Sequence, residues 1–463
     1  MKRRMTMETV ERLSRRAYLK ASAAVGAAFV LPRFAIGRAG PSANSKINVA
    51  LIGAGGIAKT CYRDCREHNV VALAEVDEVR GAGGFEAFPR AKRYRDFRKL
   101  LDAHGKELDL VIVNTPDHTH FPATYMAMER GIAVHTQKPL THNIWQARTL
   151  QKAYHKFGVH TVMGNQGHNF EGMRQIREWY EAGLIGEVRE VHAWTNRTTT
   201  NTLNAKVTLP AEPIPDTLDW DLWTGPAKLN PYNSKLCPSG WRWWWDYGLG
   251  GLGDIGCHTL DIPKYAMGLG YPSVVYTDHT INFQHLYHDK PRKEAGATYV
   301  YEYPATGDKP AVTIYWYEGG HLPRVPDGMV EQYGLRTILN GGCLLVGDKN
   351  TIYSPGMRPT APRLIKDWST IRGALPEKTV PRAVGNPVLE IMAAIRGDID
   401  KPSSNFDYAV PLTETVILGT IALRSGKRVE YRPDSMTFKD SSLNVYIKEP
   451  VRKGWECGES LPG

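Results

Sequence analysis

The chain has 463 residues, of which 42% are hydrophobic and 23% are charged. At about 150 residues per domain this length predicts two or three domains, and the composition is that of a globular protein with a hydrophobic core. Six cysteines are too few for a disulfide scaffold of this size. Cys61 and Cys65 lack a second ligand pair, which argues against a zinc ribbon, and no other spacing predicts a metal site.

The formal net charge of +10 is concentrated at the N-terminus. Residues 1–40 contain two Lys, seven Arg and two Glu, a net charge of +7, so only +3 is spread over the rest of the chain. No basic stripe for a phosphate backbone remains. Nucleic acid is therefore not expected as a partner.

The N-terminal segment has a recognisable pattern. Residues 14–20 read SRRAYLK and precede an apolar, Ala-rich run over residues 21–31, which is too short to span a membrane comfortably. The pattern resembles a twin-arginine export signal, and the alternative is a basic amphipathic helix. We expect residues 1–40 to be a signal and linker. The resemblance implies passage through the twin-arginine export machinery to the periplasm or beyond; that route carries folded proteins, often with a cofactor inside.

Two patterns of predicted secondary structure follow. Strands alternate with helices over residues 45–163, which predicts βαβ units and a parallel sheet. The strands are expected at residues 46–52, 70–76, 110–114, 133–136 and 159–163, with helices from the glycine turn to Glu67 and at 119–130 and 143–156. Over residues 164–463 the strands are rich in Val, Thr, Tyr and Trp and are separated by Pro/Gly-rich segments, which favours a mostly antiparallel sheet. These strands are expected at residues 188–195, 273–283, 297–303 and 311–317, with helices at 171–182, 387–397 and 412–425.

A glycine-rich turn joins the first strand to the first helix. Residues 53–58 read GAGGIA, a G-x-G-x-x-A pattern in which glycine lets the backbone approach a pyrophosphate. Asp77 lies 22 positions after Gly55, where a carboxylate can bind a ribose diol. This combination predicts a dinucleotide site and favours NAD over NADP, because a carboxylate repels a 2′-phosphate; Arg80 weakens that preference. The turn residues expected at the cofactor are Gly53, Gly55, Gly56 and Ile57.

Two further segments resemble a known family. Residues 111–120 read VIVNTPDHTH and residues 135–140 read HTQKPL, similar to the Gfo/Idh/MocA oxidoreductases. The resemblance implies a Rossmann domain over residues 45–163, a C-terminal α/β substrate and oligomerisation domain with an open sheet over residues 164–463, and homo-oligomers. The family usually has Glu-Lys-Pro where this chain has Gln137-Lys138-Pro139. Gln137 can still hydrogen-bond a ribose hydroxyl, without the charge.

Further cofactor and substrate contacts are expected around these segments. His118 and His120 begin a helix, where they either cap it or line the cofactor crevice. Residues 163–168, MGNQGH, follow the last strand of the first domain, where amides suit sugar hydroxyls or the amide of the cofactor. The candidate cofactor contacts are Thr115, Pro116, His118, His120, Gln137, Lys138, Asn165 and Gln166, and His168 is a candidate substrate contact.

Residues 250–261, GGLGDIGCHTLD, form the second segment that resembles the family. Asp254 and His258 are four residues apart and share one face of a helix. A histidine can take a hydroxyl proton while hydride leaves the same carbon, and a carboxylate can orient it or bind sugar hydroxyls. Lys138 can hold the substrate oxygen by its charge. The catalytic candidates are therefore Lys138, Asp254 and His258, whereas Asp261 is expected to be structural.

An aromatic run, WRWWWDY at residues 241–247, precedes this helix. Aromatic faces pack on the C–H surfaces of sugar rings, but four Trp cannot all face one pocket, so at least two are expected in the core. The substrate candidates here are Trp241, Arg242, Trp245 and Tyr247, in addition to Asp254 and His258. Residues 219–226 are expected to pack as a structural loop.

These features predict an NAD(P)-dependent oxidoreductase that acts on a carbohydrate by hydride transfer. An exported enzyme has no supply of soluble NAD, so the cofactor is expected to stay bound and to be recycled, as in glucose–fructose oxidoreductase. The family resemblance leaves an alternative open: an NAD-dependent glycoside hydrolase that oxidises a sugar hydroxyl, eliminates the glycosidic oxygen, adds water and reduces the ketone again. A noncatalytic sugar- or nucleotide-binding protein is the third alternative, for which Gln137 gives some support.

Overall fold

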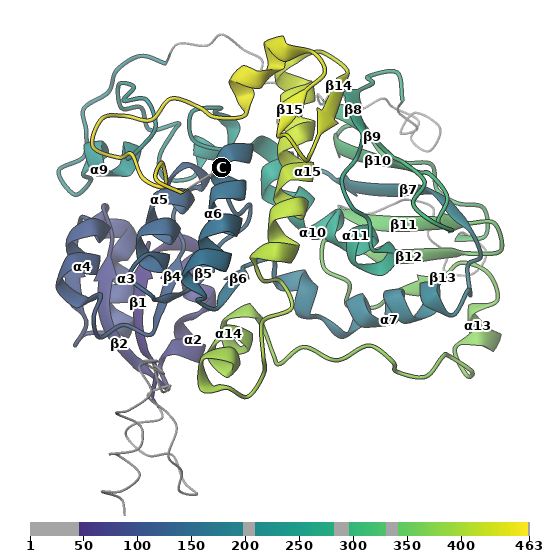
Figure 1. Cartoon of the computed structure of the whole chain (residues 1–463), viewed down its shortest axis with the longest axis horizontal. Coiled ribbons are helices and arrows are strands. Elements are labelled where there is room, and N and C mark those ends of the chain that lie inside the picture. The colour runs from purple at the N-terminus through teal and green to yellow at the C-terminus, as the bar shows by residue number, and fades with distance from the viewer. Residues whose placement is uncertain (1–45, 198–208, 282–295, 330–340, 462–463) are drawn as a thin grey trace, which may run out of the picture. The chain divides into compact units, whose positions relative to one another are not determined.

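The computed structural model describes residues 46–197, 209–281, 296–329 and 341–461. The predicted export signal and the last two residues of the strand expected at 273–283 lie outside the described residues. Within them the chain forms two sheets, one in each half of the sequence (Figure 1).

The first sheet has six parallel strands among the described residues, in the order β3-β2-β1-β4-β5-β6. They are β1 (Asn48–Ile52), β2 (Asn69–Ala74), β3 (Lys92–Tyr94), β4 (Leu110–Val113), β5 (Ala133–Thr136) and β6 (Thr161–Met163). This is the strand order of a dinucleotide-binding Rossmann domain. The central strands are buried apolar runs because helices cover both faces of a parallel sheet. The predicted fold of this half is confirmed.

Helices follow several of these strands; the two predicted at residues 119–130 and 143–156 are confirmed, and two more were not predicted. They are α3 (Glu78–Ala87), α4 (Phe97–His104), α5 (Asp117–Met128) and α6 (Ile144–Phe157). The helix expected from the glycine turn to Glu67 is instead a 3-10 turn, η2 (Gly56–Thr60), followed by one short helix, α2 (Tyr62–Cys65). Tight 3-10 turns are frequent where helices begin.

The second sheet has nine strands within the part of the chain that the structure describes, in the order β13-β12-β11-β7-β10-β9-β8-β14-β15. They are β7 (Val188–Thr195), β8 (Val274–Thr277), β9 (Gly296–Tyr303), β10 (Val312–Gly319), β11 (Gly341–Gly347), β12 (Thr351–Pro355), β13 (Arg363–Leu364), β14 (Val429–Arg432) and β15 (Thr437–Phe438). The one parallel pair among these is β7 with β10. The sheet is thus open and mostly antiparallel, as predicted.

The helices of the second half connect the two sheets. Helix α15 (Phe406–Ser425) contacts α6 and β6 on one side and β8 on the other, and α14 (Pro387–Arg396) packs against β5 and β6 (Figure 1). The remaining elements are η3 (Gln166–Asn169), α7 (Glu171–Glu181), α9 (Trp220–Thr224), η4 (Gly240–Trp243), η5 (Leu252–Gly256), α10 (Cys257–Thr259), α11 (Asp261–Met267), α13 (Trp368–Ile371) and η7 (Ser441–Tyr446). Among the described helices, α15 is long and apolar enough to cross a membrane, but 83% of its apolar window is buried, as in a core helix.

Candidate active site

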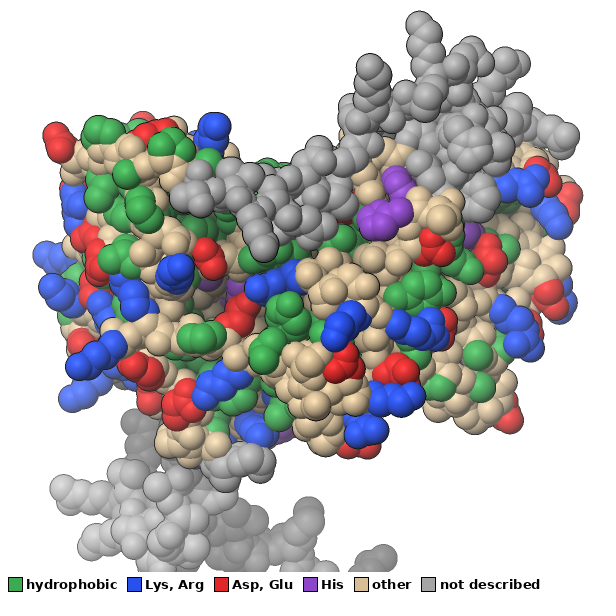
Figure 2. Space-filling view, turned by 90° about the horizontal axis from the view of Figure 1, so that it is seen from above, with side chains coloured by type: hydrophobic (Ala, Val, Ile, Leu, Met, Phe, Trp, Pro, Cys, Tyr) green, Lys and Arg blue, Asp and Glu red, His purple; other side chains and the backbone are tan. Residues whose placement is uncertain are grey.

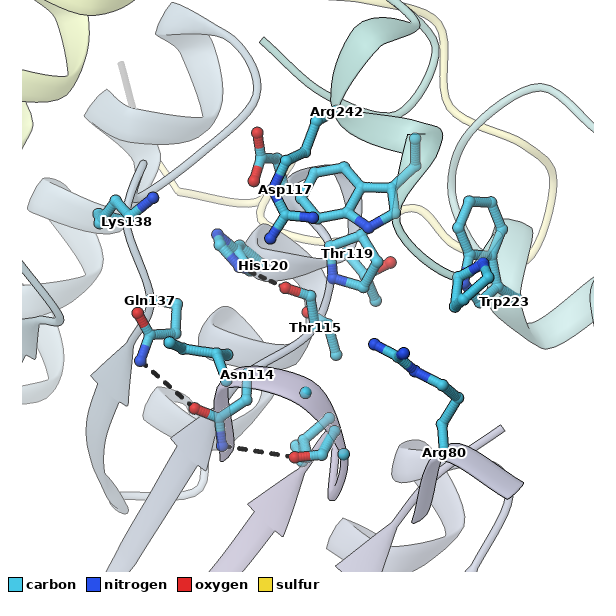
Figure 3. A pocket seen from close by; sticks show the side chains of 18 of the residues that line it. Arg80, Asn114, Thr115, Asp117, Thr119, His120, Gln137, Lys138, Trp223 and Arg242 are labelled. Atoms are coloured by element: carbon cyan, nitrogen blue, oxygen red, sulfur yellow. Dashed lines mark hydrogen bonds between the residues drawn. The ribbon is translucent and has the colours of Figure 1, made fainter. Parts of the chain in front are cut away.

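A cavity of about 350 Å³ lies between the ends of the parallel strands and segments from the C-terminal part of the chain (Figure 3). This volume is within the usual range for ligand pockets. Its lining includes Gly53, Gly55, Gly56, Ile57, Glu75, Asp77, Arg80, Asn114, Thr115, Pro116, Asp117, His120, Gln137, Lys138, Gln166, Arg197, Leu222, Trp223, Trp241, Arg242, Asp254, His258 and Arg358.

The glycine turn closes one end of the cavity. Gly53 has a φ of +84°, and a Cβ there would lie 2.9 Å from the carbonyl of Asn114. A Cβ at Gly55 would lie 2.4 Å from the carbonyl oxygen of Arg80. Only glycine fits both positions, so the turn leaves room for a close approach of backbone and ligand. That geometry fits the pyrophosphate of a dinucleotide.

Glu75 is a candidate cofactor residue that the sequence reasoning missed. It follows β2 directly, and its Oε2 accepts hydrogen bonds from the backbone N–H groups of Ala54 at 3.0 Å and Gly55 at 3.1 Å. Asp77 instead caps α3, accepting from the N–H of Val79 at 3.0 Å. Both carboxylates line the cavity. The signal that could have identified Glu75 is its position, because it is the first acidic residue after the strand that ends at Ala74.

Gln137 is connected to the glycine turn through Asn114. Its Nε2 donates to Asn114 Oδ1 at 3.5 Å, and Asn114 Nδ2 donates to the carbonyl of Gly53 at 3.4 Å (Figure 3). His120 joins the ends of two strands, since its nitrogens lie 2.7 Å from the carbonyl oxygen of Pro139 and 2.9 Å from that of Thr115. Burial lowers the pKa of His120 to about 4, so the ring is neutral. These contacts hold the backbone on either side of Lys138.

Lys138 and Asp254 form an ion pair across the cavity, with Nζ 3.0 Å from Oδ1. The same carboxylate pairs with Arg197, and Arg242 Nε lies 3.4 Å from Oδ1. Although burial raises it, the charges of Lys138, Arg242 and Arg197 bring the pKa of Asp254 well below its ordinary value. Asp254 is therefore ionised and a weak base, suited to holding cations in place.

His258 lies on the same wall of the cavity as Asp254. The two are brought together by a π-helical turn, η5, followed by α10, rather than by the regular helix expected. Such turns are frequent at functional sites. Burial, together with the charges of Lys138 and Arg358, lowers the pKa of His258 well below its ordinary value. Its buried Nδ1 has no hydrogen-bond partner among the described residues.

Asp117 is a second cavity residue that the sequence reasoning did not select. It is buried at the start of α5, and its Oδ2 accepts from the N–H of Leu249 at 3.3 Å. Burial raises the pKa of Asp117 to about 6, and the charges of Lys138 and Arg242 lower it in part. Its position within the residues 111–120 that resemble the family was the available signal.

Two predicted contacts after β6 lie outside the cavity. Asn165 Nδ2 donates to Asp261 Oδ2 at 2.9 Å, and His168 Nδ1 lies 3.0 Å from the same oxygen. Tyr408 donates to the other carboxylate oxygen of Asp261. Asn165, His168 and Asp261 are completely buried in this network. The structure therefore places Asn165 and His168 away from the cavity, whereas Gln166 lines it.

Three further candidates also point elsewhere. The nitrogens of His118 lie 2.9 Å from the carbonyl oxygen of Trp223 and 3.2 Å from that of Tyr247, so the ring is held inside the protein. His118 and Trp245 line a separate cavity, and Tyr247 is buried beneath Trp223. The structure thus places these three predicted contacts outside the cavity that the glycine turn closes. In contrast, Trp241 and Arg242 do line the cavity.

The segment expected to be only structural reaches the cavity. Leu222 and Trp223, in α9, line it beside the glycine turn. Aromatic stacking explains the arrangement, because Trp223 stacks on Trp220 with ring centroids 4.6 Å apart. Among the described residues, no group of three or more His, Cys, Asp or Glu could hold a metal ion.

Two family models match this chain. The NAD-binding Rossmann fold of the oxidoreductase family matches residues 47–165, and the C-terminal alpha/beta domain of the same family matches residues 170–299. Residues that line the cavity occur in both matched ranges.

The chain is also similar to curated proteins. It is 27% identical to the D-glucoside 3-dehydrogenase of Escherichia coli over 289 residues, 60% of this chain and 69% of that relative. It is 25% identical to the rhizopine catabolism protein MocA of Rhizobium meliloti over 145 residues, 31% of this chain and 45% of the relative. It is 31% identical to the D-apiose dehydrogenase of Paraburkholderia graminis over 113 residues, 24% of this chain and 30% of the relative. The chain thus spans less than half the length of the last two.

Solved structures share the fold. The WlbA dehydrogenase of Bordetella pertussis, in complex with NADH and UDP-GlcNAcA, has a TM-score of 0.56 and 15% identity over 84% of this chain and 99% of its own. The inositol dehydrogenase homolog of Azotobacter vinelandii, complexed with NADH and myo-inositol, has a TM-score of 0.53 and 16% identity over 83% of this chain and 98% of its own. The two family models, which together match more than half of the chain, show that it belongs to the Gfo/Idh/MocA oxidoreductase family.

Proposed function

We propose that this protein oxidises a hydroxyl group of a carbohydrate by hydride transfer to a tightly bound NAD, which is then recycled. One observation carries the proposal: Lys138, Asp254 and His258 line the cavity that the glycine turn closes. A proton acceptor, a cation for the substrate oxygen and a dinucleotide turn thus share one space.

The residues around the turn fit the cofactor. The glycine turn would hold the pyrophosphate, Asp77 a ribose diol, and Gln137 the other ribose. The carboxylates of Glu75 and Asp77 support NAD over NADP because both would repel a 2′-phosphate. Bound NAD supplies a nicotinamide that accepts hydride from a carbon.

The protein residues supply the proton chemistry. Lys138 would hold the substrate oxygen by charge, and the Asp254 carboxylate keeps its ammonium group in place. His258 is neutral and would accept the hydroxyl proton. Because Asp254 is ionised and pairs with cations, the structure supports a positioning role for it rather than the role of a base.

Residues 217–219, called the cover from here on, are bonded to the segment after β2, and these contacts support retention of NAD. The N–H of Asp219 donates to the carbonyl of Val76 at 2.9 Å, and the N–H of Glu78 donates to the carbonyl of Thr217 at 3.1 Å. Residues 217–219 are thereby joined to the end of β2. A bound nucleotide would leave only after these contacts open, which suits an enzyme that recycles its cofactor.

The test begins with the purified full-length chain. After extensive dialysis the protein is denatured, and the released nucleotide is identified and counted by mass spectrometry. We expect nearly one NAD(H) per chain. An empty protein that also fails to bind added NAD contradicts the proposal.

The same preparation is then mixed with free sugars and aryl glycosides without added NAD. Reduced nicotinamide that appears with a sugar, and disappears with a second carbonyl substrate, is the expected result. Release of the aryl group without net oxidation would instead favour the glycoside hydrolase alternative. Nucleotide that stays oxidised with every compound would favour a binding protein.

A further inference from the structure

The end of the cavity around His258 carries an excess of positive charge. Four cationic side chains line it there: Lys138, Arg197, Arg242 and Arg358. Three of these share one carboxylate, Asp254. The charges of Lys138, Arg197 and Arg358 all lower the pKa of His258, which places them close to that ring.

The acidic side chains do not balance this charge. Besides Asp254, the carboxyl group in contact with this end among the described residues is Asp117, whose pKa is raised to about 6 by burial. Even with Asp117 ionised, four cations face two carboxylates. A neutral sugar would leave this excess of positive charge without a counter-charge, whereas an anionic group would complement it.

Of these four cations, Arg358 has no carboxylate partner among the described residues. Among the described residues no carboxylate lies within ion-pair distance of its guanidinium group, in contrast to Arg197 and Arg242. The side chain is exposed at the cavity. Its guanidinium group can therefore bind an anion from the solvent side.

The backbone around Arg358 packs closely against two glycines. A Cβ at Gly172 would lie 2.0 Å from the carbonyl oxygen of Pro359, and a Cβ at Gly167 would lie 3.6 Å from the Cα of Arg358. The loop after β12 thus packs closely against η3 and the start of α7. Arg358 is presented from a fixed position rather than from a free strand end.

The cofactor does not account for these cations. Its pyrophosphate is expected at the glycine turn, where Arg80 already lies with a guanidinium nitrogen 3.3 Å from the Cβ position of Gly56. The excess is instead next to the proposed proton acceptor, where the substrate must lie. The substrate is thus the group that it complements.

We infer that the substrate is an anionic carbohydrate, whose carboxylate or phosphate group is bound by the guanidinium group of Arg358. Both groups match the guanidinium fork, which can donate two parallel hydrogen bonds to either. This inference rests on the proposed function, because it assigns the substrate to the same cavity.

The test compares three probes on the protein loaded with NAD: glucose, glucuronate and glucose 6-phosphate. Binding is measured by calorimetry for the wild type, for Arg358→Gln and for Arg372→Gln, an exposed arginine that does not line the cavity. We expect one anionic probe to bind more tightly than glucose, and added salt to weaken it. Arg358→Gln should lower the affinity for that anionic probe by roughly 10- to 100-fold, the usual value of a charged hydrogen bond, and leave the affinity for glucose unchanged.

Each outcome decides between the alternatives. Tighter glucuronate assigns a carboxylate, and tighter glucose 6-phosphate assigns a phosphate. Equal or weaker binding of both anions than of glucose, no binding of either at millimolar concentration, or the same loss in Arg372→Gln overturns the inference. Binding is read without turnover, so an anion that binds through Arg358 but leaves the nicotinamide oxidised contradicts the proposed function alone.

Discussion

The Asp254 carboxylate is shared by three cations, and this determines what its neighbour Lys138 can do. Removing the lysine charge leaves Asp254 paired with Arg197 and Arg242, so no buried carboxylate is left alone. A loss of activity in such a variant therefore reports on chemistry rather than on folding.

We expect Lys138→Met to slow reduction of the bound nicotinamide by roughly 10²- to 10⁴-fold, the usual contribution of a positioned proton-transfer or oxyanion group. The nucleotide content should stay unchanged. The measurement is the single-turnover rise of reduced-nicotinamide absorbance, with Lys156→Met on the exposed side of α6 as the matched control. A variant that keeps the wild-type rate would remove Lys138 from the mechanism.

Asp117 links the cavity to the pH dependence of stability. Burial raises its pKa from 3.8 to about 6, so the folded state binds a proton more tightly than the unfolded state. The resulting stability is present below about pH 4 and is lost as pH rises through about 6. A shift of this size corresponds to about 3 kcal/mol.

Asp117→Asn should remove this pH-dependent loss of stability, because an amide does not ionise. Its amide oxygen can still accept a hydrogen bond from the N–H of Leu249. Between about pH 4.5 and about pH 7.5 the free energy of unfolding of the wild type should fall relative to the variant by about 2 kcal/mol. Urea midpoints at both pH values measure this, with exposed Asp308→Asn as control. Parallel pH dependence in wild type and Asp117→Asn would contradict the assignment.

At the scale of elements, the cover over the nucleotide side depends on α9. Asp219 is its N-cap, and its side chain accepts from the N–H of Leu222 at 3.0 Å. Leu222 and Trp223, which line the cavity, both lie on this short helix. Loosening the cap should therefore loosen one wall of the cavity.

Asp219→Ala should lower stability by about 1 kcal/mol, the usual cost of a lost cap, and speed release of the nucleotide several-fold. Release is measured by chasing bound NADH with excess NAD and following its fluorescence. Asp440→Ala, which removes the same kind of cap from η7 outside the cavity, is the matched control. Equal release rates in the two variants would show that the cover does not retain the cofactor.

The strands also show which patterns in the sequence were sufficient to predict an element of secondary structure. The buried runs of β1, β4 and β5 are short, apolar and bounded by turns, so their strands could be predicted. Strand β3 is three residues, two of them exposed and basic, and β11 begins with two glycines. Strand β3 therefore carries no strand signal of its own and is held in its sheet by β2, whereas β11 contains a buried apolar run at residues 343–345 that was not predicted as a strand.

For the whole molecule, the basic net charge belongs to a part of the chain that the cavity does not use. Basic and acidic side chains are interspersed over the visible face, with no continuous basic stripe (Figure 2). The described residues that line the cavity all belong to the compact unit over residues 46–463. The predicted export signal and homo-oligomer remain proposals.

Deleting residues 1–45 should therefore leave the nucleotide content and the urea midpoint unchanged. The measurement compares the shortened and full chains after identical purification, by mass spectrometry of the released nucleotide and by unfolding. A shortened chain that loses its NAD or several kcal/mol of stability would show that the first unit supports the second.

The sequence by itself determined the parallel dinucleotide-binding half, the glycine turn, and the segments that carry Lys138, Asp254 and His258. Local patterns suffice there, because apolar runs, glycine turns and residues close in sequence express themselves over a few positions. Only the tertiary structure decided that Glu75 contacts the turn, that Asn165 and His168 face a buried carboxylate, and that Arg358 reaches the cavity. Those outcomes depend on which distant segments pack together, as Gly172 does with Pro359, and a side chain's direction follows from that packing.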